Sequence, residues 1–523
     1  MTSPGSPKTD MIARLPRLRN GSADRGAVAT LTLGVLTGLL AGCAAQAPRP
    51  DPPPHRASPP PVILSPDRPG AGRLSPELDG LLAAAPAGGF VEVLADLLEQ
   101  ADLTGLWLQW KQQPIGKDAR RAGTIAALEG VASRRKALES WLDEGTASGE
   151  VDVWRGFAIV NRVYVSAKPS FIRVLAKRPE IHSVVSVRND RLVEAADAPQ
   201  RAAGPTHGHD RPVREVPSTS WALDAIGARK AWSLGWNGRG VVVGSLDTGV
   251  AGQHTALRPG YRLLHGWFDP QHGRLEPYDD HGHGTEILGC AVGAGTSPGE
   301  IGVAPGATWI AARANPLNFY NSYTMTASAD WMLRTGRADI IVCAWGHGPG
   351  ICDETDVPLL RALRLAETVV ALPAGNSGPA AGTGETPASL PPLFPGDLPP
   401  LSVAAVPGRN RVLGASGRGP SPCAPGIQFP WVAAPGAALR VASARSADGY
   451  EVSGGTSHAA GYVAGAAAVL LQSCPSLSVE TLQRVLAETA VDIDPPGADP
   501  SSGHGLIDLP AALERVRSIC PGA

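Results

Sequence analysis

The chain has 523 residues, enough for two or three folded domains, and its 43% hydrophobic content can fill a sizeable core. Its 46 Lys and Arg residues nearly balance its 48 Asp and Glu residues, so the formal net charge is -2. This balance argues against a nucleic-acid-binding protein, which would carry a basic face. The 62 Gly and 50 Pro residues predict long loops and linkers around a folded core.

The first segment in chain order is an export signal. Residues 1–26 are polar and basic, and the apolar run that follows over 27–41 is too short to span a bilayer. The run ends in Leu40-Ala41-Gly42-Cys43, which resembles the bacterial lipobox, whose cysteine is lipidated and becomes the mature N-terminus. We predict a lipoprotein signal peptide over 1–42 and lipidation at Cys43. The alternatives are an ordinary signal peptide with an incidental cysteine, and a start at Met11.

This leader places the protein outside the cytoplasm. We expect Cys43 to anchor it to a bacterial membrane, at the outer membrane or the cell surface, or the mature part to be released after processing. A Pro-rich stretch within 43–75 cannot pack a core and predicts a semi-rigid linker. With Cys43 set aside, an even number of cysteines remains that can pair: Cys290, Cys343, Cys352, Cys423, Cys474 and Cys520. We predict a pair between Cys474 and Cys520, with buried free thiols as the alternative.

Residues 76–190 have the composition of a folded domain. Apolar runs predict strands over 90–97, 151–154, 157–166 and 181–187. Helical spacing predicts helices over 117–144 and 169–178. We expect Arg155-Gly156 to form the turn between the two middle strands. The order β-α-β-β-α-β is the ferredoxin-like α+β pattern. Residues 191–217 are Ala-, Pro- and polar-rich without a period, which predicts an exposed linker open to proteolysis.

Residues 218–523 form a second predicted domain, in which short apolar strands alternate with helical stretches. This alternation predicts the α/β class, with a mostly parallel central sheet and helices on both faces. The clearest strands are continuously apolar, as expected where both faces are covered: 240–246, 339–344 and 369–372.

Three polar residues of this domain fit nucleophilic catalysis. Asp247 ends a buried strand, where a carboxylate can hold an imidazole in one tautomer. His283 directly precedes a predicted helix. Ser457 begins another, so backbone N–H groups and the positive end of the helix dipole lie beside it. Taken singly, these residues have ordinary interpretations as a turn former, a loop residue and a helix cap.

Together they resemble the subtilisin-like serine protease family. Asp, His and Ser occur in that family's chain order. Asp-Thr-Gly from 247, Gly-His-Gly-Thr from 282 and Gly-Thr-Ser from 455 match its three signatures. By this resemblance Asp247, His283 and Ser457 form the catalytic triad, and Asn376, within Pro-Ala-Gly-Asn-Ser-Gly, completes the oxyanion hole. The likeness is nearest to the bacillopeptidase F branch, through 309–313 and 344–346.

The resemblance implies a serine endopeptidase that hydrolyses proteins or peptides through an acyl-enzyme. It also implies that 76–190 is an inhibitory propeptide that assists folding, so that the enzyme is made as a self-processing precursor. The primary specificity pocket is then lined by Ala344-Trp345-Gly346 and Ala374-Gly375. No organic cofactor is required. Calcium is common in the family, but no ligand set is assigned here, and we expect a monomer.

Four positions depart from the family pattern. Glu286 stands where His is usual, His458 where Met is common, Gly461 where Pro is usual, and Ala344 where Ser is usual. Glu286 either raises the pKa of His283 or serves as a first-turn carboxylate. The departures leave open a binding module that reuses an inactive cleft. An α/β-hydrolase would need Gly-x-Ser-x-Gly, and Ala459 occupies the last of those positions.

Overall fold

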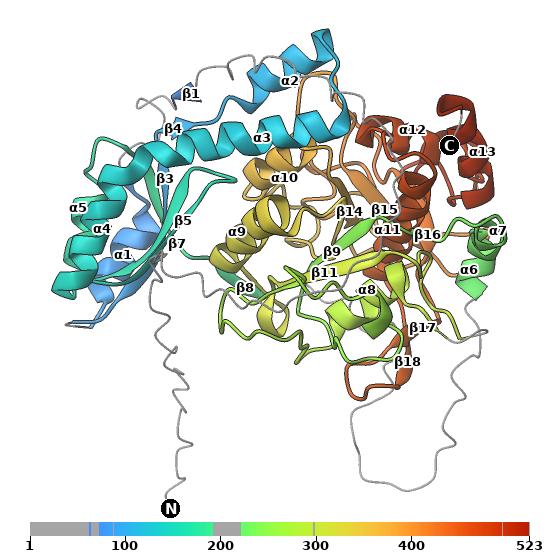
Figure 1. Cartoon of the computed structure of the whole chain (residues 1–523), viewed down its shortest axis with the longest axis horizontal. Coiled ribbons are helices and arrows are strands. Elements are labelled where there is room, and N and C mark those ends of the chain that lie inside the picture. Colours follow the sequence, from blue (N-terminus) through green and yellow to red (C-terminus); the bar gives the residue numbers. More distant parts are fainter. Residues whose placement is uncertain are drawn as a thin grey trace, which may run out of the picture. The chain divides into compact units, whose positions relative to one another are not determined.

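The computed structural model describes residues 62–63, 73–86, 88–191, 221–295, 299–493 and 495–521. The predicted signal peptide, Cys43 and nearly all of both linkers lie outside these residues, so the predictions made for them stay predictions. Two units are described: an N-terminal unit of residues 73–191 and a C-terminal unit of residues 221–521 (Figure 1). Both belong to one body that spans Ser58–Ala523.

The N-terminal unit is built on a five-stranded sheet of order β2-β7-β3-β6-β5. Its strands are β2 (Arg73–Leu74), β3 (Val91–Leu97), β5 (Val151–Phe157), β6 (Arg162–Ala167) and β7 (Ile181–Ser186). The neighbouring strands β7, β3, β6 and β5 pair antiparallel, and their order in the sheet is that of the predicted ferredoxin-like pattern. Outside the sheet lie β1 (Val62–Ile63), β4 (Glu99–Gln100) and β8 (Asn189–Arg191).

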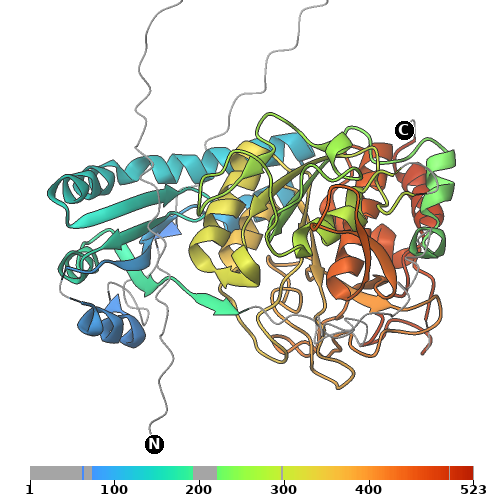
Figure 2. The same cartoon turned by 90° about the horizontal axis from the view of Figure 1, so that it is seen from below.

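Alternate residues of this sheet point to two different partners, as the strand period of two requires. One face, with Val93 and Val165, packs on helices of its own unit: α1 (Pro76–Ala84), α4 (Lys136–Ser148) and α5 (Pro169–Leu175). On the other face Leu94 and Tyr164 pack with the C-terminal unit's helix α9 (Ser322–Trp331). The rings of Tyr164 and Tyr323 lie 4.0 Å apart between centroids. Seen from below, the sheet lies directly beside the yellow helices of the C-terminal unit (Figure 2).

Two local predictions for this unit are wrong. The single helix predicted over 117–144 is divided into α3 (Lys117–Ala132) and α4, with a 3-10 turn at Ser133–Arg135 between them. Arg155-Gly156 forms no turn but lies inside β5. Gly156 lets the guanidinium of Arg135 lie close to the β5 backbone, because a side chain at this position would collide with it. The chain turns at 158–161 instead.

The C-terminal unit confirms the predicted α/β class. All neighbouring strands of its seven-stranded sheet are parallel, in the order β10-β11-β9-β13-β14-β15-β16. The strands are β9 (Val242–Asp247), β10 (Trp267–Phe268), β11 (Thr308–Arg313), β13 (Ile340–Cys343), β14 (Val369–Pro373), β15 (Leu401–Val406) and β16 (Val432–Pro435). Shorter strands lie outside it: β12 (Phe319–Asn321), β17 (Leu439–Ala442) and β18 (Tyr450–Ser453).

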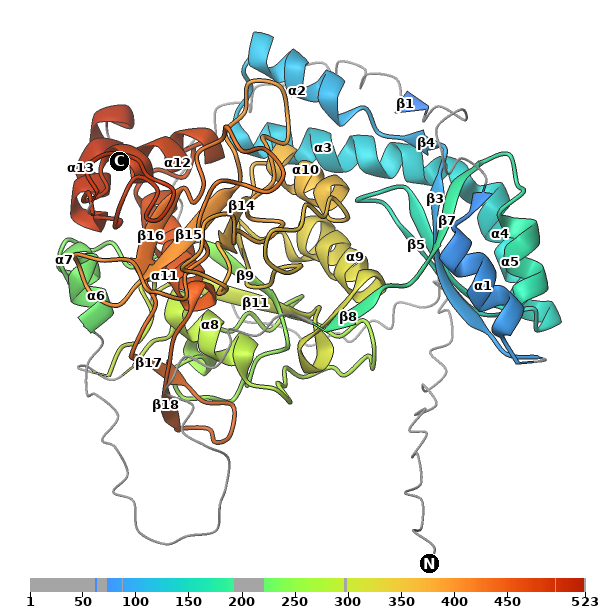
Figure 3. The same cartoon turned by 180° about the vertical axis from the view of Figure 1, so that it is seen from behind.

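Helices cover both faces of this sheet, which explains its continuously apolar strands. One face packs on α6 (Trp221–Ala225), α7 (Ala228–Ser233), α8 (His283–Val292), α11 (Thr456–Ser473), α12 (Val479–Glu488) and α13 (Leu509–Ile519). The other packs on α9, on α10 (Val357–Leu365) and on α3 of the N-terminal unit. Helix α3 and its neighbour α2 (Leu103–Gln112) run from the N-terminal unit across α10 (Figure 3).

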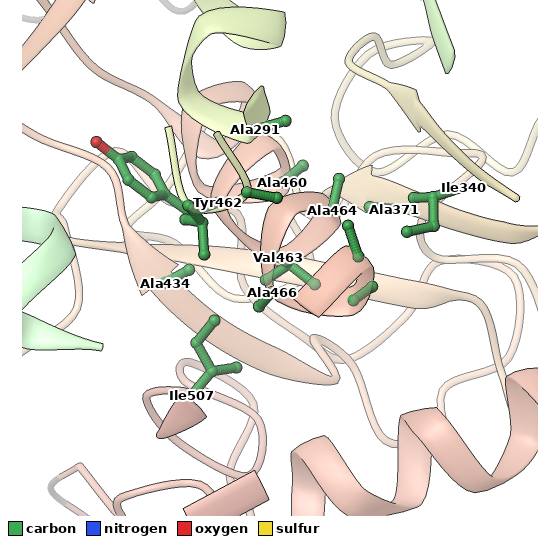
Figure 4. Close-up of a cluster of buried hydrophobic side chains, with 14 of the residues drawn as sticks. Ala291, Ile340, Ala371, Ala434, Ala460, Tyr462, Val463, Ala464, Ala466 and Ile507 are labelled. Atoms are coloured by element: carbon green, nitrogen blue, oxygen red, sulfur yellow. The ribbon is translucent and has the colours of Figure 1, made fainter. Parts of the chain in front are cut away.

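Helix α11 is the centre of the larger core. Its small side chains Ala460, Val463 and Ala464 lie among residues of α8 and the sheet (Figure 4). A Cβ atom at Gly461 would lie 2.7 Å from the backbone oxygen of Ile287 on α8. The glycine that replaces the family's usual proline therefore lets α8 and α11 pack closely, which brings their first residues near each other.

Two disulfides close loops of the C-terminal unit. Cys474 pairs with Cys520 as predicted, and Cys352 pairs with Cys423. Cys290 and Cys343 remain buried thiols. Within the described part of the chain, no helix is both long and apolar enough to cross a bilayer.

Candidate active site

Asp247 and His283 meet where β9 ends and α8 begins. Asp247 is the last residue of its strand and is 2% exposed, and His283 is the first residue of its helix. His283 Nδ1 lies 2.8 Å from Asp247 Oδ1, which also accepts a hydrogen bond from the Thr248 N–H at 2.7 Å. With Nδ1 held by the carboxylate, the imidazole can use Nε2 as a base.

Asp279, which the sequence analysis did not single out, fixes the loop before His283. Its Oδ1 accepts from Thr248 Oγ1 at 2.9 Å and from Gly282 N at 2.8 Å, and its Oδ2 accepts from Thr285 Oγ1 at 2.6 Å. The sequence signal was an Asp three residues before a glycine and a histidine that open a helix, a position that suits an Asx turn.

The carboxylates around His283 favour its charged form. Burial alone would lower the pKa of His283, but the charge and hydrogen bond of Asp247, helped by Glu286 and Asp279, outweigh it and raise that pKa to about 9. The imidazole is therefore a stronger base than a free histidine.

Ser457 lies in the first turn of α11 and is 8% exposed. Its Oγ donates to the backbone oxygen of Ala344 at 3.4 Å, and it makes no hydrogen bond to His283 in this structure. The next residue, His458, has its ring centroid 6.5 Å from that of His283. The starts of α8 and α11 thus place the nucleophile candidate beside the base candidate, with the hydroxyl turned toward the segment that follows β13.

Asn376 follows β14 and reaches the same helix start. Its Oδ1 accepts from Thr456 N at 3.0 Å and from Thr456 Oγ1 at 3.1 Å. Because the amide oxygen is held by these two donors, the NH₂ group is left to donate elsewhere. That group and the backbone N–H groups of the first turn of α11 are the donors available to an oxyanion.

Glu286 and His458, two of the departures from the family pattern, form a buried pair. Glu286 Oε2 lies 2.9 Å from His458 Nε2, and the two residues are 5% and 3% exposed. Burial opposes the carboxylate charge, but His458 outweighs it and lowers the pKa of Glu286 to about 2. The two substitutions complement each other, which explains why an acidic residue stands in this helix start.

The predicted pocket residues directly follow two neighbouring strands. Ala344, Trp345 and Gly346 follow β13, and Ala374 and Gly375 follow β14, which pairs with β13 in parallel. The Trp345 side chain belongs to the buried cluster on the α9 and α10 face, whereas Ala344 belongs to the cluster on the opposite face. The Trp345 ring therefore packs into the core.

A fourth acidic residue, Glu385, lies between these two segments. It is 3% exposed, and its Oε1 accepts from the Asn376 N–H at 3.2 Å. Sequence reasoning missed it because it lies in an irregular stretch without a motif. No group of three or more His, Cys, Asp or Glu side chains suited to a metal ion occurs among the residues that the structure describes.

The last strand of the N-terminal unit enters the same region. β8 pairs antiparallel with β12, in a register that joins Asn189 to Asn321. β12 follows β11 closely, and the intervening Asn315 donates its backbone N–H to Asp247 O at 3.0 Å. Arg188 bonds Asp353 at 2.7 Å beside this strand pair. An extended segment of the N-terminal unit is thus held near the Asp247 end of the sheet.

Comparison with known proteins gives a consistent result. Residues 238–505 match the model of the subtilase family. Bacillopeptidase F of Bacillus subtilis is 28% identical over 440 residues, which cover 77% of this chain and 29% of that protein. Subtilisin DY of Bacillus licheniformis is 29% identical over 300 residues, which cover 56% of this chain and 98% of that protein.

Among solved structures, fervidolysin from Fervidobacterium pennivorans matches with a TM-score of 0.54 at 20% identity. The match covers 83% of this chain and 64% of that chain, and it shows a shared fold. Fervidolysin is also 28% identical in sequence over 323 residues. The chain spans 29% of the length of bacillopeptidase F and 44% of that of fervidolysin.

Proposed function

The chain belongs to the subtilase family, and from that premise we propose that it is an exported serine endopeptidase with Asp247, His283 and Ser457 as its triad. The observation that carries the proposal is the 2.8 Å contact between Asp247 and His283 at the helix start that packs beside Ser457. The protein's substrates are proteins or peptides, and no step requires an organic cofactor.

The reaction follows from the positions of these groups. The Ser457 hydroxyl turns from Ala344 O to His283, which takes its proton as Oγ bonds to the peptide carbonyl carbon. The oxyanion accepts hydrogen bonds from Asn376 Nδ2 and from backbone N–H groups at the start of α11. His283 returns the proton to the leaving amine. Water then hydrolyses the acyl-enzyme by the same route, and Asp247 stabilises the imidazolium in each half.

Labelling with a fluorophosphonate tests this proposal, because the reagent bonds only to an activated serine. The processed protein should be labelled and Ser457→Ala should not. Folded protein that takes up no label, with no hydrolysis of a casein substrate, would instead support the binding module that uses an inactive cleft.

We further propose that the N-terminal unit is a propeptide that the enzyme removes itself. Three observations support this: β8 pairs with β12 beside the site, the following linker is polar and Pro-rich, and the match to bacillopeptidase F is longer than the C-terminal unit alone could supply. Ser457→Ala should accumulate as an uncleaved precursor in a host that lacks related proteases. Normal maturation of that variant would show that another protease makes the cut. N-terminal sequencing of the mature wild type locates the bond.

The lipobox at Cys43 supports a lipid anchor on a bacterial membrane, and the monomer stays our expectation. Stable anchoring needs more than one acyl chain, so we propose a diacylated or triacylated cysteine. Radiolabelled palmitate should enter the wild type and not Cys43→Ser. Equal labelling of the two would refute the anchor while leaving the protease proposal intact.

A further inference from the structure

Glu385 occupies the slot between the two segments assigned to the primary specificity pocket. On one side, a side chain at Gly346 would collide with Glu385 Oε2. On the other, a Cβ atom at Gly375 would lie 2.6 Å from Cγ and Cδ of Glu385. Both flanking residues are glycines, so the carboxylate packs directly against two backbones.

The carboxylate is joined to the catalytic groups by a short chain of hydrogen bonds. Its Oε1 accepts from Asn376 N at 3.2 Å and from Ser377 Oγ at 3.3 Å. Asn376 in turn binds Thr456, the residue before Ser457. The segment that contains Gly346 also contains Ala344, whose backbone oxygen accepts a hydrogen bond from the Ser457 hydroxyl. Glu385 therefore lies at the side of the cleft where the residue preceding the scissile bond must fit.

Glu385 lacks the basic partner that several other buried carboxylates of this unit have. Glu286 is paired with His458, Asp356 with His347 and Asp397 with Arg364. Glu385 forms no ion pair within the described residues, and the nearby His347 is already bound to Asp356 at 3.0 Å. A buried carboxylate without a cation is costly, and burial raises the pKa of Glu385.

We propose that Glu385 is the specificity-determining residue of this site and that the missing cation is the side chain of a substrate Lys or Arg immediately before the scissile bond. This inference rests on the proposed function. An ammonium or guanidinium group entering the slot would pair with Oε2 while Oε1 keeps its two donors. A neutral or apolar side chain would bury the carboxylate without a partner, so the site rejects it.

Four peptide substrates that differ only in the residue before the scissile bond (Arg, Lys, Gln or Phe) test the proposal on the processed enzyme. Wild type should prefer Arg and Lys over Gln and Phe by about 10²-fold or more in kcat/KM. Glu385→Gln keeps an oxygen for the Asn376 and Ser377 donors but removes the charge. In this variant kcat/KM should fall by about 10²-fold for the Arg and Lys peptides and change by less than about threefold for the Phe peptide.

Glu354→Gln is the matched control, because it removes one carboxylate from the exposed segment near Cys352. It should leave the preference unchanged, which excludes a general effect of net charge. If Glu385 only supports the Asn376 loop, Glu385→Gln lowers kcat equally for all four peptides, and that result overturns the proposal. A wild type without a basic preference overturns it too.

Benzamidine, a cation of the shape of an arginine side chain, gives a measurement that does not need the variant to fold. It should slow fluorophosphonate labelling of wild-type Ser457 at concentrations where neutral benzamide has no effect, and equal effects of the two would overturn the assignment. Failure to cleave any of the four peptides, or to take up the label, would refute the endopeptidase proposal itself. Cleavage without selectivity for a basic residue refutes the role of Glu385 alone.

Discussion

The two units bury their sheets in different ways. The parallel sheet of the C-terminal unit has its own helices on one face and mostly its own helices on the other. The antiparallel sheet of the N-terminal unit covers one face with its own helices, while Leu94 and Tyr164 of the other face pack on α9 of its neighbour. The N-terminal unit thus depends on its neighbour to cover one of the two faces of its sheet. This asymmetry suits a segment that folds with the enzyme and then leaves it.

The links within and between the units differ as well. The C-terminal unit is closed by two disulfides. The contact between units is rich in charge, including Arg120 with Glu367 at 2.7 Å and Arg121 with Asp339 at 3.2 Å. In the same contact Asp330 accepts from the backbone N–H groups of Ala158 and Ile159 at 2.9 and 2.8 Å. Disulfides link segments of the part that stays, whereas only non-covalent contacts, apolar and polar, hold the part that we propose is removed.

The largest expected effect within the C-terminal unit belongs to Asn376. Asn376→Ala removes one oxyanion donor, so kcat should fall by about 10²–10³-fold with little change in KM. Steady-state kinetics on a peptide substrate, normalised to folded enzyme by circular dichroism, measures it. A residue that only formed a turn would instead lower the melting temperature. A folded Asn376→Ala variant with kcat within about threefold of wild type would show that Asn376 does not donate to the oxyanion.

The next effect concerns the covalent link at the C-terminus. Cys474 and Cys520 close a loop with a sequence separation of 46. Replacing both by Ala in the Ser457→Ala precursor should lower the free energy of unfolding of the C-terminal unit by about 3–4 kcal/mol on the chain-entropy model. Denaturant titration measures the change. Mass spectrometry of an unreduced digest is the independent check, and free thiols at both positions would contradict the pairing.

The contact between the units should respond to Asp330. Asp330→Ala leaves two buried N–H groups without an acceptor, at a cost of about 2–3 kcal/mol. Hydrogen exchange of the Ala158 and Ile159 amides in the full-length Ser457→Ala precursor should then speed up by about 30–150-fold, the equivalent of that energy. Asp330→Asn keeps one acceptor oxygen and is the control. Equal exchange in Asp330→Ala and the parent would show that this carboxylate does not hold the units together.

The smallest effect is on pH dependence. His283 must be neutral to act as a base, and its pKa is raised to about 9, so kcat/KM should rise with pH through an apparent pKa well above the ordinary 6.5. The same shift stabilises the fold below pH 6.5, and this stabilisation is lost as pH rises through about 9. Glu286→Gln removes one cause and should lower the apparent pKa by about one unit. An unchanged profile would show that the Glu286–His458 pair does not act on His283.

Much of this protein could be predicted from its sequence because the signals are local. Apolar runs identified β9, β13 and β14, since strands covered on both faces need no polar side chain. Short motifs indicated Asp247, His283, Ser457 and Asn376 through their resemblance to the subtilase signatures, and the catalytic roles of these residues stay proposals. The ferredoxin-like order followed from the order in which strand-like apolar runs and helix-like apolar spacing occur along the chain.

Other features were decided only by the tertiary structure. Ala158, Ile159 and Val160 look like strand residues, yet they lie in a turn. Asp330 of the other unit accepts from the amides of Ala158 and Ile159, and all three side chains pack in that unit's core. Gly156 looks like a turn residue, yet it makes room for Arg135. The surroundings of Glu385 and the contact between Glu286 and His458 are formed by segments that lie far apart in the sequence. Burial and charge pairing are properties of the folded chain, so no local pattern predicts that Glu385 is buried near Asn376 without an ion-pair partner among the described residues.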